Sequence, residues 1–134
     1  MDLKPRHYWI IGLVIATAFL HFGAALDARL YEPGHPLPDL LFTLNGLGYL
    51  GLLLAYFVPV RFLEERHGLT WWILFLYIIV TILAWVAIWV GLNVIVGGMA
   101  FFGPDSLYGV PAKIAEVILL FLLWRDRQLT AAAE

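Results

Sequence analysis

The chain has 134 residues, of which 63% are hydrophobic and only 13% charged, and its formal net charge is −2. Soluble domains carry roughly 25% charged residues, and a soluble domain of this size has too little interior to hide so much hydrocarbon. This composition argues against a soluble enzyme, a disordered chain and a nucleic-acid partner, and the absence of cysteine excludes disulfides and cysteine-ligated metals.

Four windows are long and apolar enough to cross a bilayer, which takes about 20 mostly apolar residues in a helix. They cover residues 8–26, 40–60, 69–92 and 108–124. The alternation of apolar and polar residues that marks a transmembrane barrel is missing. We therefore predict an all-α, multi-pass protein of the cell membrane, whose single domain (1–134) is a four-helix transmembrane bundle in contact with lipid.

The first window also resembles a signal peptide. Lys4 and Arg6 precede an apolar run, and the small residues at 23–25 resemble a cleavage site that would leave Leu26 at the start of the mature chain. The run is long for such a peptide and contains a tryptophan and a histidine. We therefore favour an uncleaved first span and keep cleavage as the alternative.

Small residues in the first two windows predict close contacts between helices. Gly12 and Ala16 lie four residues apart in the first window, and Gly46, Gly48 and Gly51 lie in the second. The three glycines also match the G-x-G-x-x-G fingerprint of dinucleotide-binding proteins. That fingerprint needs a strand before it and a helix after it, whereas here it lies inside an apolar window. We therefore assign the glycines to helix packing.

Proline and glycine predict where the helices begin and end. The proline-rich segment 32–38 separates the first two spans, and Asp39 is predicted to cap the start of the second. Pro111 is expected in the first turn of the last span. The third helix either continues through 93–102 or breaks near Gly91, with that segment lying at the membrane interface. We favour the break.

Lysine and arginine near the ends of the windows predict the orientation. The outer side has only Arg29 and Lys113. The flanks that would share the other side with the chain ends contain six basic residues: Lys4, Arg6, Arg61, Arg66, Arg125 and Arg127. Both termini are therefore predicted to be cytoplasmic.

The last window contains two charged residues, Lys113 and Glu116. Their spacing of three puts them on one face of a helix, and at about 1.5 Å per residue Glu116 lies roughly 12 Å below Tyr108. Charges at such depth are costly unless they are paired. Two interpretations stay open: an ion pair that locks the last helix into the bundle, and a functional site.

Two further polar residues, His21 and Asn45, are predicted at a similar depth in the outer half of the bilayer. With Lys113 and Glu116 they would form one polar cluster, which is either structural or a ligand site. The spacing of His, Asp and Glu matches no metal motif, and only one histidine lies well inside a span, which argues against a haem with two histidine ligands. We expect no catalytic residue, metal or cofactor.

The third window has a stripe of polar and aromatic residues at steps of four: Tyr77, Thr81, Trp85, Trp89 and Asn93. This spacing places them along one face of a helix. We favour ordinary packing for the stripe. The alternative is the wall of a site for a quinone, a carotenoid or a lipid tail.

Three features together resemble a group of small prokaryotic four-helix membrane proteins to which no activity is assigned. They are the histidine late in the first window, the stretch 41–50 and the Lys-Ile-Ala-Glu run at 113–116. The resemblance implies the same four-span fold and a joint role for His21, Asn45, Lys113 and Glu116. It implies no substrate.

The favoured function is that of a non-catalytic accessory subunit that packs in a larger membrane complex with other protein subunits. It is favoured because the sequence has no pair of nucleophile and base and no large soluble domain. The alternative is a small transporter or ligand-binding protein that uses the polar cluster, with Glu116 as proton acceptor and Lys113 as its modulator. A membrane enzyme, in which His21 and Glu116 act as acid and base, is the third candidate function.

Overall fold

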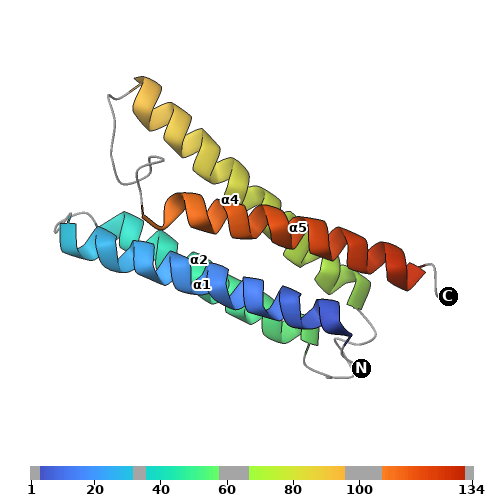
Figure 1. Cartoon of the computed structure of the whole chain (residues 1–134). Helices are drawn as coiled ribbons and strands as arrows, with labels where there is room; N and C mark the ends of the chain where they lie inside the picture. The colour runs from blue at the N-terminus through green and yellow to red at the C-terminus, as the bar shows by residue number, and fades with distance from the viewer. Residues whose placement is uncertain (1–3, 32–35, 58–66, 96–106, 132–134) are drawn as a thin grey trace.

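The computed structural model describes residues 4–31, 36–57, 67–95 and 107–131, and this part of the chain forms four α-helices (Figure 1). They are α1 (Pro5–Tyr31), α2 (Pro36–Phe57), α4 (His67–Ile95) and α5 (Gly109–Ala131). The prediction of an all-α chain is confirmed for these residues. Three segments, Pro5–Leu30, Leu37–Phe57 and Gly68–Ile88, are long and apolar enough to cross a membrane.

The helices run alternately in opposite directions, so that the start of α1 and the end of α5 lie at the same end of the molecule (Figure 1). α1 packs most extensively against α2 and next against α5. α4 contacts α2 and α5 less, and its C-terminal half diverges from α5 (Figure 1). The bundle is therefore closed at the end with the chain termini and open at the other end.

The position of the apolar core follows from this arrangement. Its buried residues come from the first half of α1, the second half of α2, the first half of α4 and the second half of α5: Ile10, Val14, Ala18, Tyr49, Leu53, Tyr56, Trp71, Leu74, Ile78, Leu119 and Leu123. All of these half-helices meet at the closed end. The outward faces of the same helices are also apolar, with Phe19, Leu54, Leu76 and Phe121 more than half exposed.

Two predicted helix limits need correction. α2 begins at Pro36, so Asp39 lies in the first turn and is not the cap. Proline is tolerated in a first turn because the N–H that it lacks would have no partner there. The carboxylate of Asp39 instead accepts a hydrogen bond from the hydroxyl of Thr43 at 3.4 Å and lies 3.5 Å from Nε of Arg29. Pro111 lies in the first turn of α5, as predicted.

The favoured break near Gly91 is wrong, because α4 continues to Ile95. A glycine inside a helix costs only about 1 kcal/mol relative to alanine. A break leaves backbone N–H and C=O groups without their helical partners, and an unpaired backbone group in apolar surroundings costs more than that. The continuous helix is therefore favoured. The rest of the segment 93–102, the end of the second predicted span at 58–60, and Arg61 and Arg66 lie outside the described residues.

The five small residues that were predicted to pack between helices divide into two groups. A Cβ atom on Gly46 would lie 2.5 Å from the ring of Phe22 in α1, and one on Gly48 would collide with the hydroxyl of Tyr77 in α4. These two glycines let neighbouring aromatic side chains approach α2 closely. The other three face outward, away from the helices of this chain: Gly12, Ala16 and Gly51.

Candidate functional site

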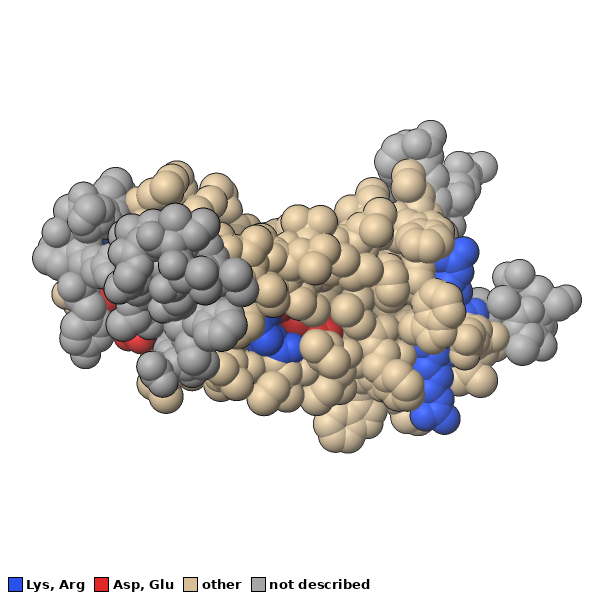
Figure 2. Space-filling view, turned by 90° about the horizontal axis from the view of Figure 1, so that it is seen from above, with Lys and Arg blue, Asp and Glu red and all other residues tan. Residues whose placement is uncertain are grey.

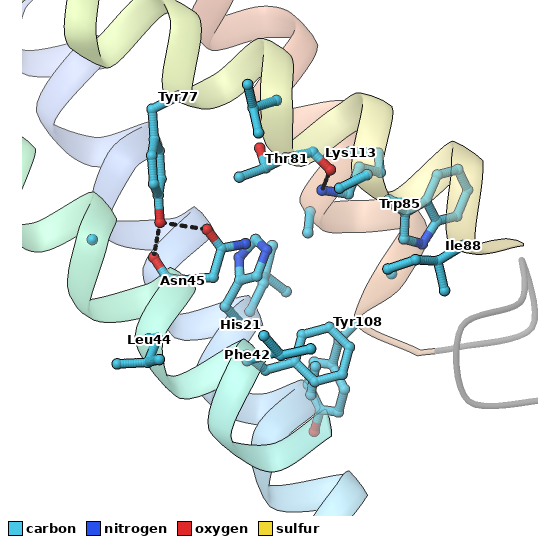
Figure 3. A pocket seen from close by; sticks show the side chains of 18 residues that line it. His21, Phe42, Leu44, Asn45, Tyr77, Thr81, Trp85, Ile88, Tyr108 and Lys113 are labelled. Carbon is cyan, nitrogen blue, oxygen red and sulfur yellow. Dashed lines mark hydrogen bonds between the residues drawn. The ribbon is translucent and has the colours of Figure 1, made fainter. Parts of the chain in front are cut away.

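A pocket of about 480 Å³ lies in the open half of the bundle, and all four described helices contribute to its lining. This volume is in the range of typical small-molecule sites. Aliphatic side chains and four aromatic rings form most of the wall, the rings being those of Phe42, Tyr77, Trp85 and Tyr108 (Figure 3). Gly23 of α1 provides room for the ring of Tyr108, which lies 2.5 Å from the position of a Cβ atom there.

An ion pair lies at one side of this pocket. The ammonium group of Lys113, which lines the pocket, donates a hydrogen bond to Oε2 of Glu116 at 2.6 Å and a longer one to the backbone carbonyl of Thr81 at 3.5 Å. The side chain of Glu116 is fully buried, and that of Lys113 is 13% exposed. Figure 2 shows a small spot of blue and red in the middle of the molecule, set in uncharged surface and separate from the charged residues nearer the two ends.

His21 connects α1 to this ion pair. Its ring is buried, with Nδ1 2.8 Å from the backbone carbonyl oxygen of Thr17 and Nε2 3.6 Å from Oε1 of Glu116. Oε1 is buried and makes no hydrogen bond with any described residue. We call His21, Lys113 and Glu116 the pocket triad. The triad comes from two helices that pack against each other, α1 and α5.

Asn45 lines the same pocket from α2 and is hydrogen-bonded to α4. The hydroxyl of Tyr77 donates to its side-chain oxygen at 2.6 Å and is 3.1 Å from its backbone oxygen (Figure 3). Three of the four residues predicted to cluster therefore line one pocket, His21, Asn45 and Lys113, and Glu116 lies buried behind Lys113. His21, Lys113 and Glu116 are in direct contact, and Asn45 is hydrogen-bonded to Tyr77 of α4.

Two hydroxyl groups near Glu116 are not among the predicted site residues. Tyr49 Oη and Thr81 Oγ1 lie 2.9 Å apart, and both face the carboxylate of Glu116. Tyr49 follows Asn45 by one helical turn, so its presence on the same face of α2 follows from the helical period. Thr81 belongs to the stripe of the third window, together with Tyr77 and Trp85, which also line the pocket. The side chains of Trp89 and Asn93 lie outside the described set.

A second polar cluster at the closed end is not anticipated by the sequence. Asp126 of α5 is buried, and Arg6 and His7 donate to its Oδ1, the latter at 3.2 Å. The hydroxyl of Tyr56 donates to its Oδ2 at 3.2 Å. We call Arg6, His7, Tyr56 and Asp126 the end cluster. The only sequence signal for it is an isolated carboxylate between Arg125 and Arg127.

The chain matches no protein-family profile, and comparisons with curated proteins and with solved structures find no significant match. Within the described residues, no group of three His, Asp or Glu side chains is arranged to hold a metal ion. Over the described residues, the fold and the pocket define a helical bundle with three helices apolar enough to span a membrane and a mainly apolar cavity beside a buried ion pair.

Proposed function

We propose that α5 is a fourth membrane span and that both termini are on the cytoplasmic side of the cell membrane. α5 has 23 residues and is therefore about 35 Å long, which is enough to cross the hydrocarbon core. Its charged residues Lys113 and Glu116 turn inward, whereas Ile114, Val117 and Phe121 are more than half exposed. The shared position of the two chain ends and the excess of basic residues beside them support the orientation.

Within that membrane protein, the pocket is a binding site for a small, mainly apolar molecule. The observation that carries this proposal is the position of a cavity against a buried ion pair, since intramembrane charges are kept at a cost and mark functional sites. The four aromatic rings suit an elongated or flat apolar body. Lys113 faces the pocket with an ammonium group, so the polar end of the ligand is an acceptor such as a carbonyl or carboxylate.

The test is to identify what the protein retains when it is purified from membranes in mild detergent. Ala84 lines the pocket, and Ala84→Phe fills part of the cavity from an exposed position on α4. Ala87→Phe is the matched control, because Ala87 is exposed on the same helix and does not line the pocket. Solvent extraction and mass spectrometry should find a specific apolar compound in the wild type and in Ala87→Phe, and much less of it in Ala84→Phe. Equal retention by all three proteins contradicts the proposal.

An accessory subunit of a larger membrane complex is the second candidate function. The distal half of α4 favours it, because Leu83, Val86 and Ala87 are exposed where this helix diverges from its neighbours. Apolar side chains of this kind pack against lipid or against another membrane protein. Native mass spectrometry of gently extracted membranes tests this function, since it requires a stable larger partner.

A further inference from the structure

The geometry of His21 determines where its protons lie. Nδ1 is 2.8 Å from the carbonyl oxygen of Thr17, and a carbonyl oxygen only accepts hydrogen bonds. Nδ1 therefore has a hydrogen atom in the neutral and in the charged ring. In the neutral ring the other nitrogen, Nε2, then carries a lone pair, and it is this nitrogen that faces Oε1 of Glu116 at 3.6 Å.

The lone pairs of Nε2 of His21 and Oε1 of Glu116 face each other in a buried place, and one proton between them would turn their repulsion into a hydrogen bond. A carboxylate oxygen and an unprotonated imidazole nitrogen are both acceptors, so they attract each other only when a hydrogen atom lies between them. Oε1 has no other hydrogen bond within the described residues. We propose that His21 and Glu116 bind one exchangeable proton between Nε2 and Oε1, which makes this side of the pocket a proton-binding site.

The groups around the pair come from all four described helices. Thr17 and His21 are on α1, Tyr49 is on α2, Tyr77 and Thr81 are on α4, and Lys113 is beside Glu116 on α5. The hydroxyl groups of Thr17, Tyr49, Tyr77 and Thr81 are neutral and add no charge. When His21 is neutral, the positive charge of Lys113 balances the negative charge of Glu116, and the pocket triad has no net charge. With the additional proton its net charge is +1.

This change of charge links the proton to the ligand. A carboxylate that enters the pocket is favoured by the net positive charge of the protonated triad, and by reciprocity the bound carboxylate favours protonation. The site therefore takes up an amphiphile with an acidic head together with a proton. This coupling rests on the proposed ligand site, whereas the proton site itself does not depend on it.

The proton site is tested with the full chain labelled with ¹⁵N in histidine and reconstituted in lipid nanodiscs. NMR over a range of pH should show Nδ1 of His21 protonated throughout and Nε2 gaining a proton as the pH falls, with His21→Gln assigning the signals. Glu116→Gln offers an amide N–H to Nε2 permanently, so the uptake seen in the wild type should be lost. Lys113→Met keeps the pair and removes the opposing charge, so uptake should begin at a higher pH.

An unprotonated Nδ1, or identical titration of the wild type and Glu116→Gln, overturns the proton site. The second result would show that Nε2 does not share its proton with Glu116. Coupling is tested by adding dodecanoate or its uncharged methyl ester to the nanodiscs. Dodecanoate should shift the protonation of His21 by about one pH unit, a tenfold coupling, and the ester should not. If His21 titrates as expected but dodecanoate causes no shift, only the coupling is overturned. If His21 does not titrate but Ala87→Phe still retains the apolar compound and Ala84→Phe does not, the proton site is overturned and the ligand pocket is not.

Discussion

The two buried carboxylates of α5, Glu116 and Asp126, lie roughly three helical turns apart and have different surroundings. Both oxygens of Asp126 accept hydrogen bonds, from Arg6 and His7 on one side and from Tyr56 on the other. Glu116 has one oxygen bonded to Lys113 and one that makes no hydrogen bond with any residue the structure describes. A fully bonded carboxylate holds helices together, whereas one with a spare acceptor has capacity left for a proton or a ligand.

Packing around the two groups differs in the same way. The end cluster adjoins the apolar core, where half-helices of all four elements meet. The pocket triad adjoins a cavity of about 480 Å³ in the half from which α4 diverges. The same four helices therefore provide a closed end suited to stability and an open end suited to binding.

The largest expected effect comes from breaking the end cluster. Asp126→Ala leaves Arg6 and His7 without their acceptor in a buried place, and we expect a loss of about 3–5 kcal/mol in the free energy of unfolding. Thermal unfolding in detergent measures it. Asp39→Asn is the control, since its partner Arg29 is 76% exposed and exposed pairs contribute little. Equal stability of the two variants would contradict a structural role for the end cluster.

A smaller effect is expected at the pocket triad. Lys113→Met leaves the buried carboxylate of Glu116 uncompensated, which costs about 3 kcal/mol near neutral pH, the lower end of the range for breaking a buried pair, because Glu116 can take up a proton. This cost should shrink at lower pH, because protonation removes the unpaired charge.

The double variant Lys113→Met/Glu116→Leu replaces the buried pair with apolar groups and should return to within about 1 kcal/mol of the wild-type stability. It should also lose the selective ligand retention. If both the single and the double variant match the wild type in stability at every pH, the pair is not buried as described.

The smallest effect concerns the packing of α2 against α4. Gly48→Leu places a side chain where the hydroxyl of Tyr77 lies, so that this hydroxyl can no longer bond to Asn45. We expect the overpacking to lower the free energy of unfolding by about 1–3 kcal/mol. Gly51→Leu, one turn along the same helix, meets open space and is the matched control. Unfolding temperatures that rank these two variants in the opposite order would contradict the close approach at Gly48.

Local features of the site could be predicted from the sequence. Lys113 and Glu116 pair because residues three apart on a helix are neighbours, and this relation needs no other helix. That His21 and Asn45 lie at the same level of the bundle follows from counting residues along the apolar windows, and both line one pocket. Helical periodicity could have placed Tyr49 on the face of Asn45 and Thr81 on the face of Tyr77. It could not have shown that both face Glu116 on α5, because periodicity relates residues only within one helix.

The composition and the long apolar windows by themselves determined that this chain is helical and suited to a membrane, since hydrocarbon requires each segment to satisfy its own backbone hydrogen bonds. Only the tertiary structure decided which faces meet. It joined His7 to Asp126 across 119 positions of sequence, turned Gly12 and Gly51 outward, and opened a pocket where α4 diverges. In apolar helices nearly every face is hydrophobic, so the pattern does not mark the buried side, and packing geometry alone selects it.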